Sequence, residues 1–580
     1  MVIERIFPFL GWVRLTSLHT LRRDAVAGLV VALVLIPQSL AYAQLAGVPA
    51  HHGLYASLIP VALGALFGSS RQLATGPVAL TSLLTAASVT PLAVAGTSKF
   101  VVYAVLLALL SGVMQLALGW MRMGVIVNFL SHPVLIGFTS AAAIIISLSQ
   151  LSALLAVPMG KSGHFLEDIW DLLAHLSGLH PSTTAIGLAA LALMWALRRM
   201  APTLPGVLIA VVLSTAVSYL MGFAESGGKV VGEIPRGVPP LSVPIVEWRA
   251  SIQLFPAALV IALISFMEAM ASARVIATRT RVPVDMNQEL IGQGLAKIGS
   301  AFSQSFPVSG SFSRSALNLA AGAKTGASAL FTAFFVLLTL LFFTPLLHHL
   351  PLSVLSAIIM MAVVPLVTFR GMRDAWRART DDGIAAVATF IATLAFAPYI
   401  QNGILTGVVL SLGCFLYRSM TPRVVVLGRD QDGTLRDAAR FDLPALHPRV
   451  SAIRFDGQLY FANVSYFEES VLKLVTDNAN LRFILVVSDG INGLDASGVE
   501  MLSRLVERLG ENGITVVFSG VKKQVREVME RTGLAARIGE ENLFRPFITE
   551  TVALEAIRQR LGGAPTEAQG GSVPGRQPAG

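Results

Sequence analysis

Long apolar runs recur through the first 420 residues, separated by polar stretches that contain Gly and Pro. Many approach the length of about 20 residues that an α-helix needs to cross a bilayer. The longer runs lie at 24–46, 53–68, 99–120, 132–156, 182–200, 205–223, 255–277, 325–347, 352–367, 383–398 and 402–420. Two half-length segments at 77–90 and 310–321, and a more polar one at 286–304, complete the set. We therefore predict an α-helical polytopic membrane protein with fourteen spans, which places both chain ends on one side.

Beyond residue 420 the pattern changes to short strand-like and helix-like runs. The β-like runs lie at 458–462, 482–487 and 514–519, and the helix-like runs at 464–477, 496–510, 522–532 and 549–561. This alternation predicts a small α/β domain with one sheet. The predicted domains are an N-terminal cytoplasmic segment at 1–23, a transmembrane domain at 24–420, a linker at 421–440, the α/β domain at 441–562 and a disordered tail at 563–580.

The composition indicates that the two parts of the chain meet different solvents. The whole sequence is 54% hydrophobic and 13% charged, with a mean hydropathy of +0.69. Residues 1–420 are roughly 9% charged and residues 421–580 roughly 24%, whereas an average soluble chain carries about 25%. The first part therefore has the composition of a membrane domain and the second that of a water-soluble domain.

The net charge of +9 arises in the membrane part, where Lys and Arg gather in the loops on one side. With the N-terminus inside, that side holds the arginine pairs 22–23 and 198–199 and the cluster at 370–379. Because cytoplasmic loops are enriched in Lys and Arg, both termini are predicted to be cytoplasmic, in the inner membrane of a bacterium. The basic balance then belongs to loops that flank the membrane, and it does not indicate nucleic-acid binding.

Fourteen spans divide into two halves of seven, and an odd number of spans inverts the second half relative to the first. The third span of each half is the short one, and Gly and Pro precede it at 75–77 and 307–310. Paired short, interrupted segments at matching places in two halves indicate a transporter's binding site. Helices that begin in mid-membrane direct free N–H groups and a partial positive charge at an anion. The residues at these two starts are Val78 and Ala79 in the first half, and Ser311, Phe312, Ser313 and Arg314 in the second. The alternative is that the small residues serve only close helix packing.

Two further positions carry polar chemistry inside apolar spans. In the first span Pro37 interrupts the helix, and Gln38 and Tyr42 share one face at i, i+4 spacing, where both can donate hydrogen bonds to an oxyanion. The alternative is a kinked helix with polar contacts between helices. Glu268 lies near the middle of the eighth span, where a bare carboxylate is costly. This predicts a group that takes up and releases protons, and the alternative is a structural ion pair with Arg314.

Several motifs resemble the SulP family, the sulfate permeases. They are Pro-Ala-His-His-Gly-Leu-Tyr-Ala-Ser at 49–57, Gly-Ser-Ser-Arg at 68–71, Asp-Ala-Val-Ala-Gly at 24–28, Ile-Pro-Gln at 36–38 and Ser-Phe-Ser-Arg-Ser at 311–315. The family usually has an aromatic residue where this chain has His52. The C-terminal part resembles the STAS domain, named after sulfate transporters and anti-sigma factor antagonists.

The resemblance implies two inverted seven-helix repeats that form a core domain moving against a gate domain, generally in a homodimer. It implies that the anion binds between the third and tenth spans. Its contacts would be Gln38 and Tyr42 from the first span, Val78 and Ala79 from the third, and Ser313 and Arg314 from the tenth. The acidic position of the eighth span is linked to protons in some members, whereas sodium-coupled bicarbonate members tend to carry Asp there. In the STAS-like part, Ser497 matches a loop serine that is phosphorylated in anti-sigma factor antagonists, and the alternative is that Asp495 and Ser497 only cap a helix.

These observations favour a secondary active transporter for a small oxyanion, with proton-coupled sulfate uptake as the leading hypothesis. The alternatives are sodium-coupled bicarbonate transport, C4-dicarboxylate transport, and an anion exchanger, channel, sensor or voltage-dependent motor. No nucleotide-binding loop, metal-ligand cluster or nucleophile–base motif stands out, so we expect neither an enzyme nor a cofactor or metal. Cys414 is the only cysteine, which excludes intrachain disulfides. The expected partners are an anion, a proton or sodium ion, the lipid bilayer and a second copy of the chain.

Overall fold

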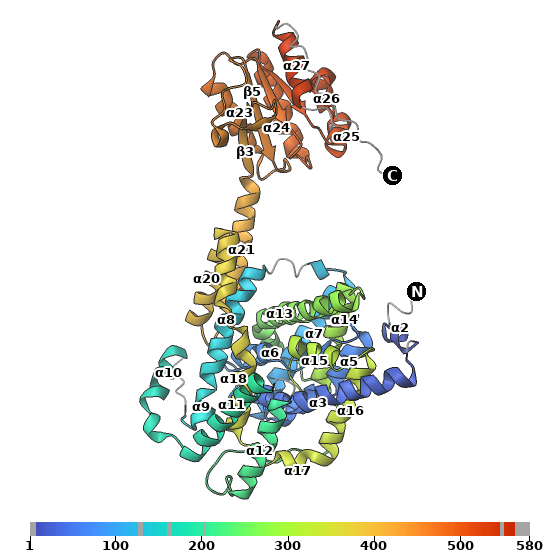
Figure 1. Cartoon of the computed structure of the whole chain (residues 1–580), viewed down its shortest axis with the longest axis vertical. Helices are drawn as coiled ribbons and strands as arrows, with labels where there is room; N and C mark the ends of the chain where they lie inside the picture. Colours follow the sequence, from blue (N-terminus) through green and yellow to red (C-terminus); the bar gives the residue numbers. More distant parts are fainter. Residues whose placement is uncertain are drawn as a thin grey trace, which may run out of the picture. The chain divides into compact units, whose positions relative to one another are not determined.

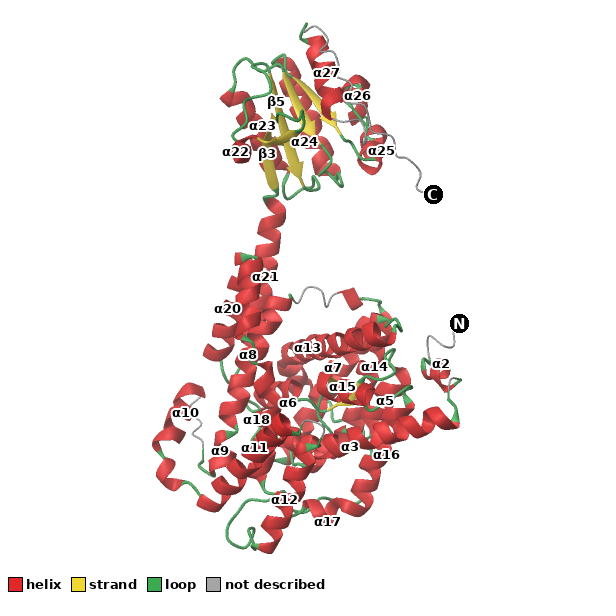
Figure 2. Cartoon of the chain, viewed as in Figure 1, coloured by secondary structure: helices red, strands yellow, loops and turns green. Residues whose placement is uncertain are grey.

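The computed structural model describes residues 7–14, 16–125, 131–158, 165–201, 204–545 and 550–562. The chain forms two compact units, Met1–Ser411 and Leu412–Gly580. The first unit is almost entirely helical, and the second contains a five-stranded sheet (Figures 1 and 2). The predicted tail at 563–580 lies outside the described residues.

Each of the fourteen predicted spans is helical. In chain order they are α3 (Leu18–Ala46), α4 (His51–Ala56) with α5 (Ile59–Phe67), α6 (Ala79–Val89), α7 (Ser98–Trp120), α8 (His132–Ser149) with α9 (Leu151–Leu155), α11 (Pro181–Met200), α12 (Gly206–Leu220), α13 (Trp248–Thr280), α14 (Met286–Phe302), α15 (Phe312–Ala320), α16 (Ala327–Leu338) continuing to α17 (Thr344–Leu347), α18 (Leu352–Val363), α20 (Thr380–Ala395) and α21 (Ile400–Met420). Within the described residues, seven helical segments are long and apolar enough to cross a membrane alone, and shorter apolar helices accompany them.

Three helices of the first unit were not predicted: α2 (Phe9–Val13), α10 (Phe165–Ala174) and α19 (Phe369–Ala378). They are short, and α19 carries three arginines on ten residues. Apolar runs of membrane length do not reveal such helices because they are too short to span a bilayer, and the hydrophobic residues of α10 and α19 occupy one face only.

Equivalent elements of the two halves make equivalent contacts. Helix α3 packs on α16 as α13 packs on α7, and α5 and α14 pack together between these pairs. The short helices α6 and α15 both contact α3 and α13, in the interior of this group (Figure 1). A second group joins α8 to α20 and α18, and α11 to α18 and α12. This pairing is that of two inverted repeats, as predicted.

Local sequence explains how α3 begins and how close its neighbours come. Ser17 forms a capping box with Thr20, and the helix ends at Gly47 in the left-handed conformation. A Cβ atom on Gly53 would lie 1.9 Å from the carbonyl oxygen of Ser39, so only glycine allows α4 to approach α3 there. In the same helix α4, His52 is buried and its Nδ1 lies 2.5 Å from the carbonyl oxygen of Gln304.

The second unit is built on a sheet of order β4-β3-β5-β6-β7. Its strands are β3 (Arg423–Arg429), β4 (Leu435–Asp437), β5 (Val450–Asp456), β6 (Phe483–Val487) and β7 (Thr515–Ser519). The last three run parallel, and β3 is antiparallel to both of its neighbours. The helices are α22 (Ala438–Phe441), α23 (Val464–Asp477), α24 (Ala496–Glu511), α25 (Lys523–Arg531), α26 (Leu534–Ile538) and α27 (Glu550–Arg560). Separate apolar clusters cover the two faces of the sheet, one with α23 and α24 and the other with α27.

Two predictions for this unit are corrected by the structure. The predicted strand at 458–462 is wrong: the strand is β5, and Leu459 forms only an isolated bridge with Leu494. The segment 421–440, predicted as a linker, supplies β3 and β4 of the sheet. In β3 the buried Val425 and Leu427 alternate with more exposed residues, and such a short half-buried strand gives a weak sequence signal.

We predict that a fragment 421–562 is more stable than a fragment 441–562. The shorter fragment loses β3, and burying one Val or Leu side chain contributes roughly 1.5–3 kcal/mol. That loss is large against the total of about 5–15 kcal/mol typical of a domain. Thermal and urea unfolding followed by circular dichroism measures the difference. Equal transitions for the two fragments would contradict a structural role for β3.

Candidate functional site

A short antiparallel ladder joins the two halves of the first unit. Strand β1 (Ala74–Gly76) pairs with β2 (Ser309–Ser311), with Thr75 opposite Gly310. All six residues are buried. The ladder pairs backbone groups that would otherwise lack partners in a water-poor interior. Helices α6 and α15 begin directly after β1 and β2, so they leave the ladder at opposite ends.

Four of the predicted site residues lie at the start of α15. Ser311 is the N-cap, and its Oγ accepts a long hydrogen bond of 3.4 Å from the backbone N–H of Arg314. The Oγ atoms of Ser311 and Ser313 lie 3.4 Å apart. Phe312 is 59% exposed, and Ser313 is exposed too. The start of α15 is therefore accessible from outside the helix bundle.

The first turn of α6 is arranged differently. Val78 is the N-cap residue in an extended conformation, and none of the side chains that the structure describes caps the helix. Val78 and Ala79 are both buried. The first N–H groups of α6 thus have no side-chain acceptor in the described part of the chain, as expected where a helix start is left free for another acceptor.

Arg314 is 1% exposed and only partly hydrogen-bonded. Its Nη1 donates to Oε1 of Gln38 over 3.4 Å, whereas Nε and Nη2 have no partner among the described residues. Gly76, at φ 152°, leaves space here, because a Cβ atom on it would lie 3.3 Å from Nη2 of Arg314. A buried donor without a partner costs about 1–3 kcal/mol, and more when it is charged. The guanidinium therefore has two donor groups for which the described residues supply no acceptor.

Glu268 on α13 lies beside this group. Its side chain is partly exposed, and Oε2 accepts from Oγ of Ser309 at 3.2 Å. The structure places Glu268, Arg314 and the buried Tyr42 within electrostatic range of one another. Among the described side chains, Glu268 forms no direct ion pair with Arg314, although the two groups interact electrostatically.

Sequence reasoning assigned no role to Lys297, which lies on α14 and is fully buried. Its Nζ donates to Oε1 of Gln115 at 2.9 Å, and it interacts electrostatically with Glu268. The available signal was a lysine inside a membrane segment otherwise rich in small and apolar residues.

Two buried carboxylates that were also not predicted hold the loops next to the short helices. Asp24 on α3 accepts from the backbone N–H of Lys324 at 2.6 Å and from Oγ1 of Thr325 at 2.5 Å, just after α15. Glu289 on α14 accepts from the backbone N–H groups of Ser69 and Ser70 at 2.9 and 3.1 Å, just before β1. These bonds fix the chain on which the predicted site residues stand.

In the second unit, Asp495 is the N-cap of α24, as the capping alternative predicted. Its Oδ1 accepts from the backbone N–H of Gly498 at 2.8 Å, and its Oδ2 accepts from that of Phe461 at 2.9 Å. Ser497 lies in the first turn of the same helix and is partly exposed. Its phosphorylation stays a prediction.

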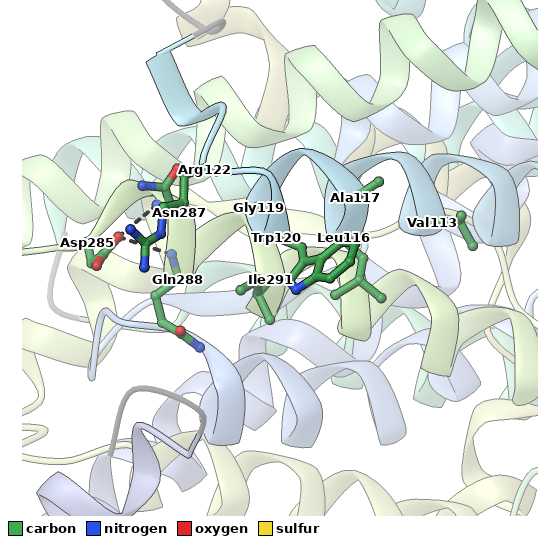
Figure 3. A pocket seen from close by; sticks show the side chains of 10 residues that line it. All are labelled: Val113, Leu116, Ala117, Gly119, Trp120, Arg122, Asp285, Asn287, Gln288 and Ile291. Atoms are coloured by element: carbon green, nitrogen blue, oxygen red, sulfur yellow. Dashed lines mark hydrogen bonds between the residues drawn. The ribbon is translucent and has the colours of Figure 1, made fainter. Parts of the chain in front are cut away.

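A groove of about 870 Å³ lies away from these residues, where α7 ends and α14 begins (Figure 3). Trp120 and Ile291 are among its apolar lining residues, and Arg122 and Asp285 lie at its polar end. Oδ1 of Asp285 accepts from the backbone N–H groups of Asn287 and Gln288, which caps α14. None of the predicted site residues lines this groove.

Comparison with known proteins identifies the family. Residues 21–389 match the sulfate permease family, and residues 445–550 match the STAS domain. The chain is 32% identical to the probable sulfate transporter 4.2 of Arabidopsis thaliana, over 93% of this chain and 82% of that protein. It is also 32% identical to a probable sulfate transporter of Mycobacterium tuberculosis, over 93% and 96% of the two chains.

Solved structures share the fold. The inward-facing murine Slc26a9 anion transporter matches with a TM-score of 0.88 at 21% identity, over 96% of this chain and 94% of that one. The transmembrane domain of the cyanobacterial bicarbonate transporter BicA matches with a TM-score of 0.57 at 23% identity, over 69% and 99%. The helical membrane fold, the C-terminal STAS domain and the two sequence matches agree, and the chain belongs to the sulfate permease family, a family of multi-pass membrane transporters and not of enzymes.

Proposed function

We propose that this anion transporter takes up sulfate together with protons. The observation that carries the proposal is the buried guanidinium of Arg314, which has two donor groups without a partner among the described residues. An oxyanion supplies acceptors for both donors in the planar geometry that a guanidinium favours.

The elements around Arg314 supply further donors for the same anion. Ser313 in the first turn of α15 is exposed, and the start of α6 at Val78 and Ala79, which no described side chain caps, follows the opposite end of the ladder. Two helix N-termini and a guanidinium together favour a compact anion of high charge. The names of the Arabidopsis and Mycobacterium relatives support sulfate as that anion.

Glu268 is proposed to couple anion uptake to protons. In its ionised form it repels an anion at Arg314, and in its protonated form this repulsion is removed. Binding of the anion and of the proton then reinforce each other, as reciprocal linkage requires. The fold that the chain shares with BicA keeps sodium-coupled bicarbonate transport as the second candidate.

We also propose an orientation in the membrane, the kind of membrane and an oligomeric state. Both termini and the STAS domain lie in the cytoplasm, the membrane is a bacterial inner membrane, and two copies form a dimer. The distribution of Lys and Arg over the loops supports the orientation. The group of α3 to α7 and α13 to α16 is proposed to move against the group that contains α8, α11, α12, α18 and α20.

Replacement of Arg314 tests the anion site. We expect Arg314→Ala to weaken sulfate binding by about 1–3 kcal/mol, because a charge-assisted hydrogen bond is lost. Arg314→Lys keeps the charge without the planar donor pair and should weaken binding less. Titration calorimetry on the purified, folded variants measures both effects. Unchanged sulfate affinity in Arg314→Ala would remove Arg314 from the site.

Replacement of Glu268 tests the coupling. Glu268→Gln imitates the protonated carboxyl, so the variant should bind sulfate and exchange it across the membrane but lose accumulation driven by a proton gradient. Uptake of labelled sulfate into liposomes with an imposed gradient, beside a sulfate–sulfate exchange assay, separates the two activities. Accumulation as steep as in the wild type would disprove coupling at Glu268.

A further inference from the structure

We propose that Lys297 supplies a second positive charge at the transport site and makes it selective for divalent over monovalent anions. The inference rests on the proposed function, with the anion at Arg314 and the proton at Glu268. Lys297 would be a specificity-determining residue in addition to Arg314 and Glu268.

Close packing of two helices encloses Lys297. Helices α7 and α14 meet at Gly112 and Gly294: a Cβ atom on Gly112 would lie 2.9 Å from Cβ of Lys297, and one on Gly294 would lie 2.7 Å from the backbone nitrogen of Leu116. Because neither glycine carries a side chain, the helices approach until the whole side chain of Lys297 is covered, with 0% exposed. A lysine in such a place is costly and is retained for a use.

A glutamine holds the ammonium in position. Nζ of Lys297 donates to Oε1 of Gln115 at 2.9 Å. Nε2 of Gln115 donates to the carbonyl oxygen of Ala262 at 2.6 Å and to Oγ of Ser265 at 3.1 Å, both on α13. The amide group is thereby oriented with its oxygen toward Lys297. An ammonium has three N–H donors, and the described residues supply an acceptor for one of them.

The same contacts lead to Glu268. Ser265 and Glu268 are three residues apart on α13 and so lie on one face of the helix. Oγ of Ser309 lies 2.9 Å from the carbonyl oxygen of Ser265 and 3.2 Å from Oε2 of Glu268. Residues from α7, α13, α14 and β2 thus form a continuous polar path from Lys297 to Glu268, and the two charges interact electrostatically.

Few other titratable groups surround Glu268. Tyr42 on α3 and Arg314 on α15 interact with it, in addition to Lys297. Helix α6 carries no titratable residue. The titratable residues of α7, Lys99 and Tyr103, lie near its start, where Tyr103 donates to Glu247 over 2.9 Å. Helix α14 also carries the buried Glu289, whose carboxyl group accepts from the backbone N–H groups of Ser69 and Ser70 and from Nε2 of Gln293. The charged groups that interact with Glu268 itself are Arg314 and Lys297.

These charges balance for a divalent anion. With Glu268 protonated, Arg314 and Lys297 contribute two positive charges, and a sulfate ion cancels both. With Glu268 ionised, one positive charge remains, and a bound sulfate leaves the site with a net negative charge. In a poorly solvated interior a net charge is strongly disfavoured. One proton per divalent anion is thus the neutral loaded state, whereas without Lys297 the protonated site matches a monovalent anion.

The test compares two tetrahedral anions of different charge, sulfate and perchlorate, in titration calorimetry on the full-length detergent-purified protein at acidic pH. For Lys297→Gln we expect the dissociation constant of sulfate to rise on the order of tenfold and that of perchlorate to change by less than about threefold. Lys297→Arg keeps the charge and should retain the preference of the wild type. Lys99→Gln removes a lysine from the exposed start of α7 and should leave both constants unchanged.

Gln115→Glu is the second variant. It places a carboxylate of the same size as the glutamine amide against Nζ of Lys297, so that the charge of the lysine is balanced while the lysine itself is kept. It should show the same loss of sulfate preference, even if Lys297→Gln does not fold. The assignment of Lys297 would be overturned if the ratio of the sulfate and perchlorate dissociation constants were unchanged in both variants. This holds whether neither constant changes or both rise by the same factor. Failure of the wild type to bind sulfate would instead contradict the proposed function.

Discussion

The pairing of β1 with β2 is the constraint on which the transport unit depends. Extended backbone in the interior of a membrane domain must find hydrogen-bond partners, because no lipid group can supply them. Here each of the two extended segments supplies the partners of the other, with Ala74 opposite Ser311 and Gly76 opposite Ser309. The ladder thereby ties the first half of the chain to the second and sets the points at which α6 and α15 begin.

The polar groups around the ladder follow from this arrangement. Helix α6 begins at the buried residues Val78 and Ala79, and the buried guanidinium of Arg314 belongs to the first turn of α15. Ser315 strengthens the link, since its Oγ accepts from the backbone N–H of Ala74 at 2.8 Å. The carboxylates of Asp24 and Glu289 then bind the flanking loops, so the positions of the donors depend on contacts between distant parts of the chain.

Charged side chains in the interior of a membrane domain are stabilised only as a group. Arg314, Lys297 and Glu268 come from α15, α14 and α13, and none of them forms a close ion pair with another in the described structure. Each of them instead forms a hydrogen bond with a neutral side chain: Glu268 with Ser309, Lys297 with Gln115, and Arg314 with Gln38. Because its hydrogen-bond partner is neutral, the carboxyl group of Glu268 can change its protonation without breaking a direct ion pair. For the same reason, no carboxylate bound directly to Arg314 competes with an entering anion.

The sequence by itself determined the helical spans, the inverted halves, the two short helices and the candidate residues from Gln38 to Arg314, because apolar length and the cost of a buried charge are properties of a local segment. It did not determine that β3 joins the sheet at 423–429 or that 458–462 stays outside it, since partly buried strands and loops share similar residues. Only the tertiary structure placed Lys297 and Gln115 beside Glu268. Their contact depends on how closely α7 and α14 approach at Gly112 and Gly294, and residues almost two hundred positions apart carry no local sign of that distance.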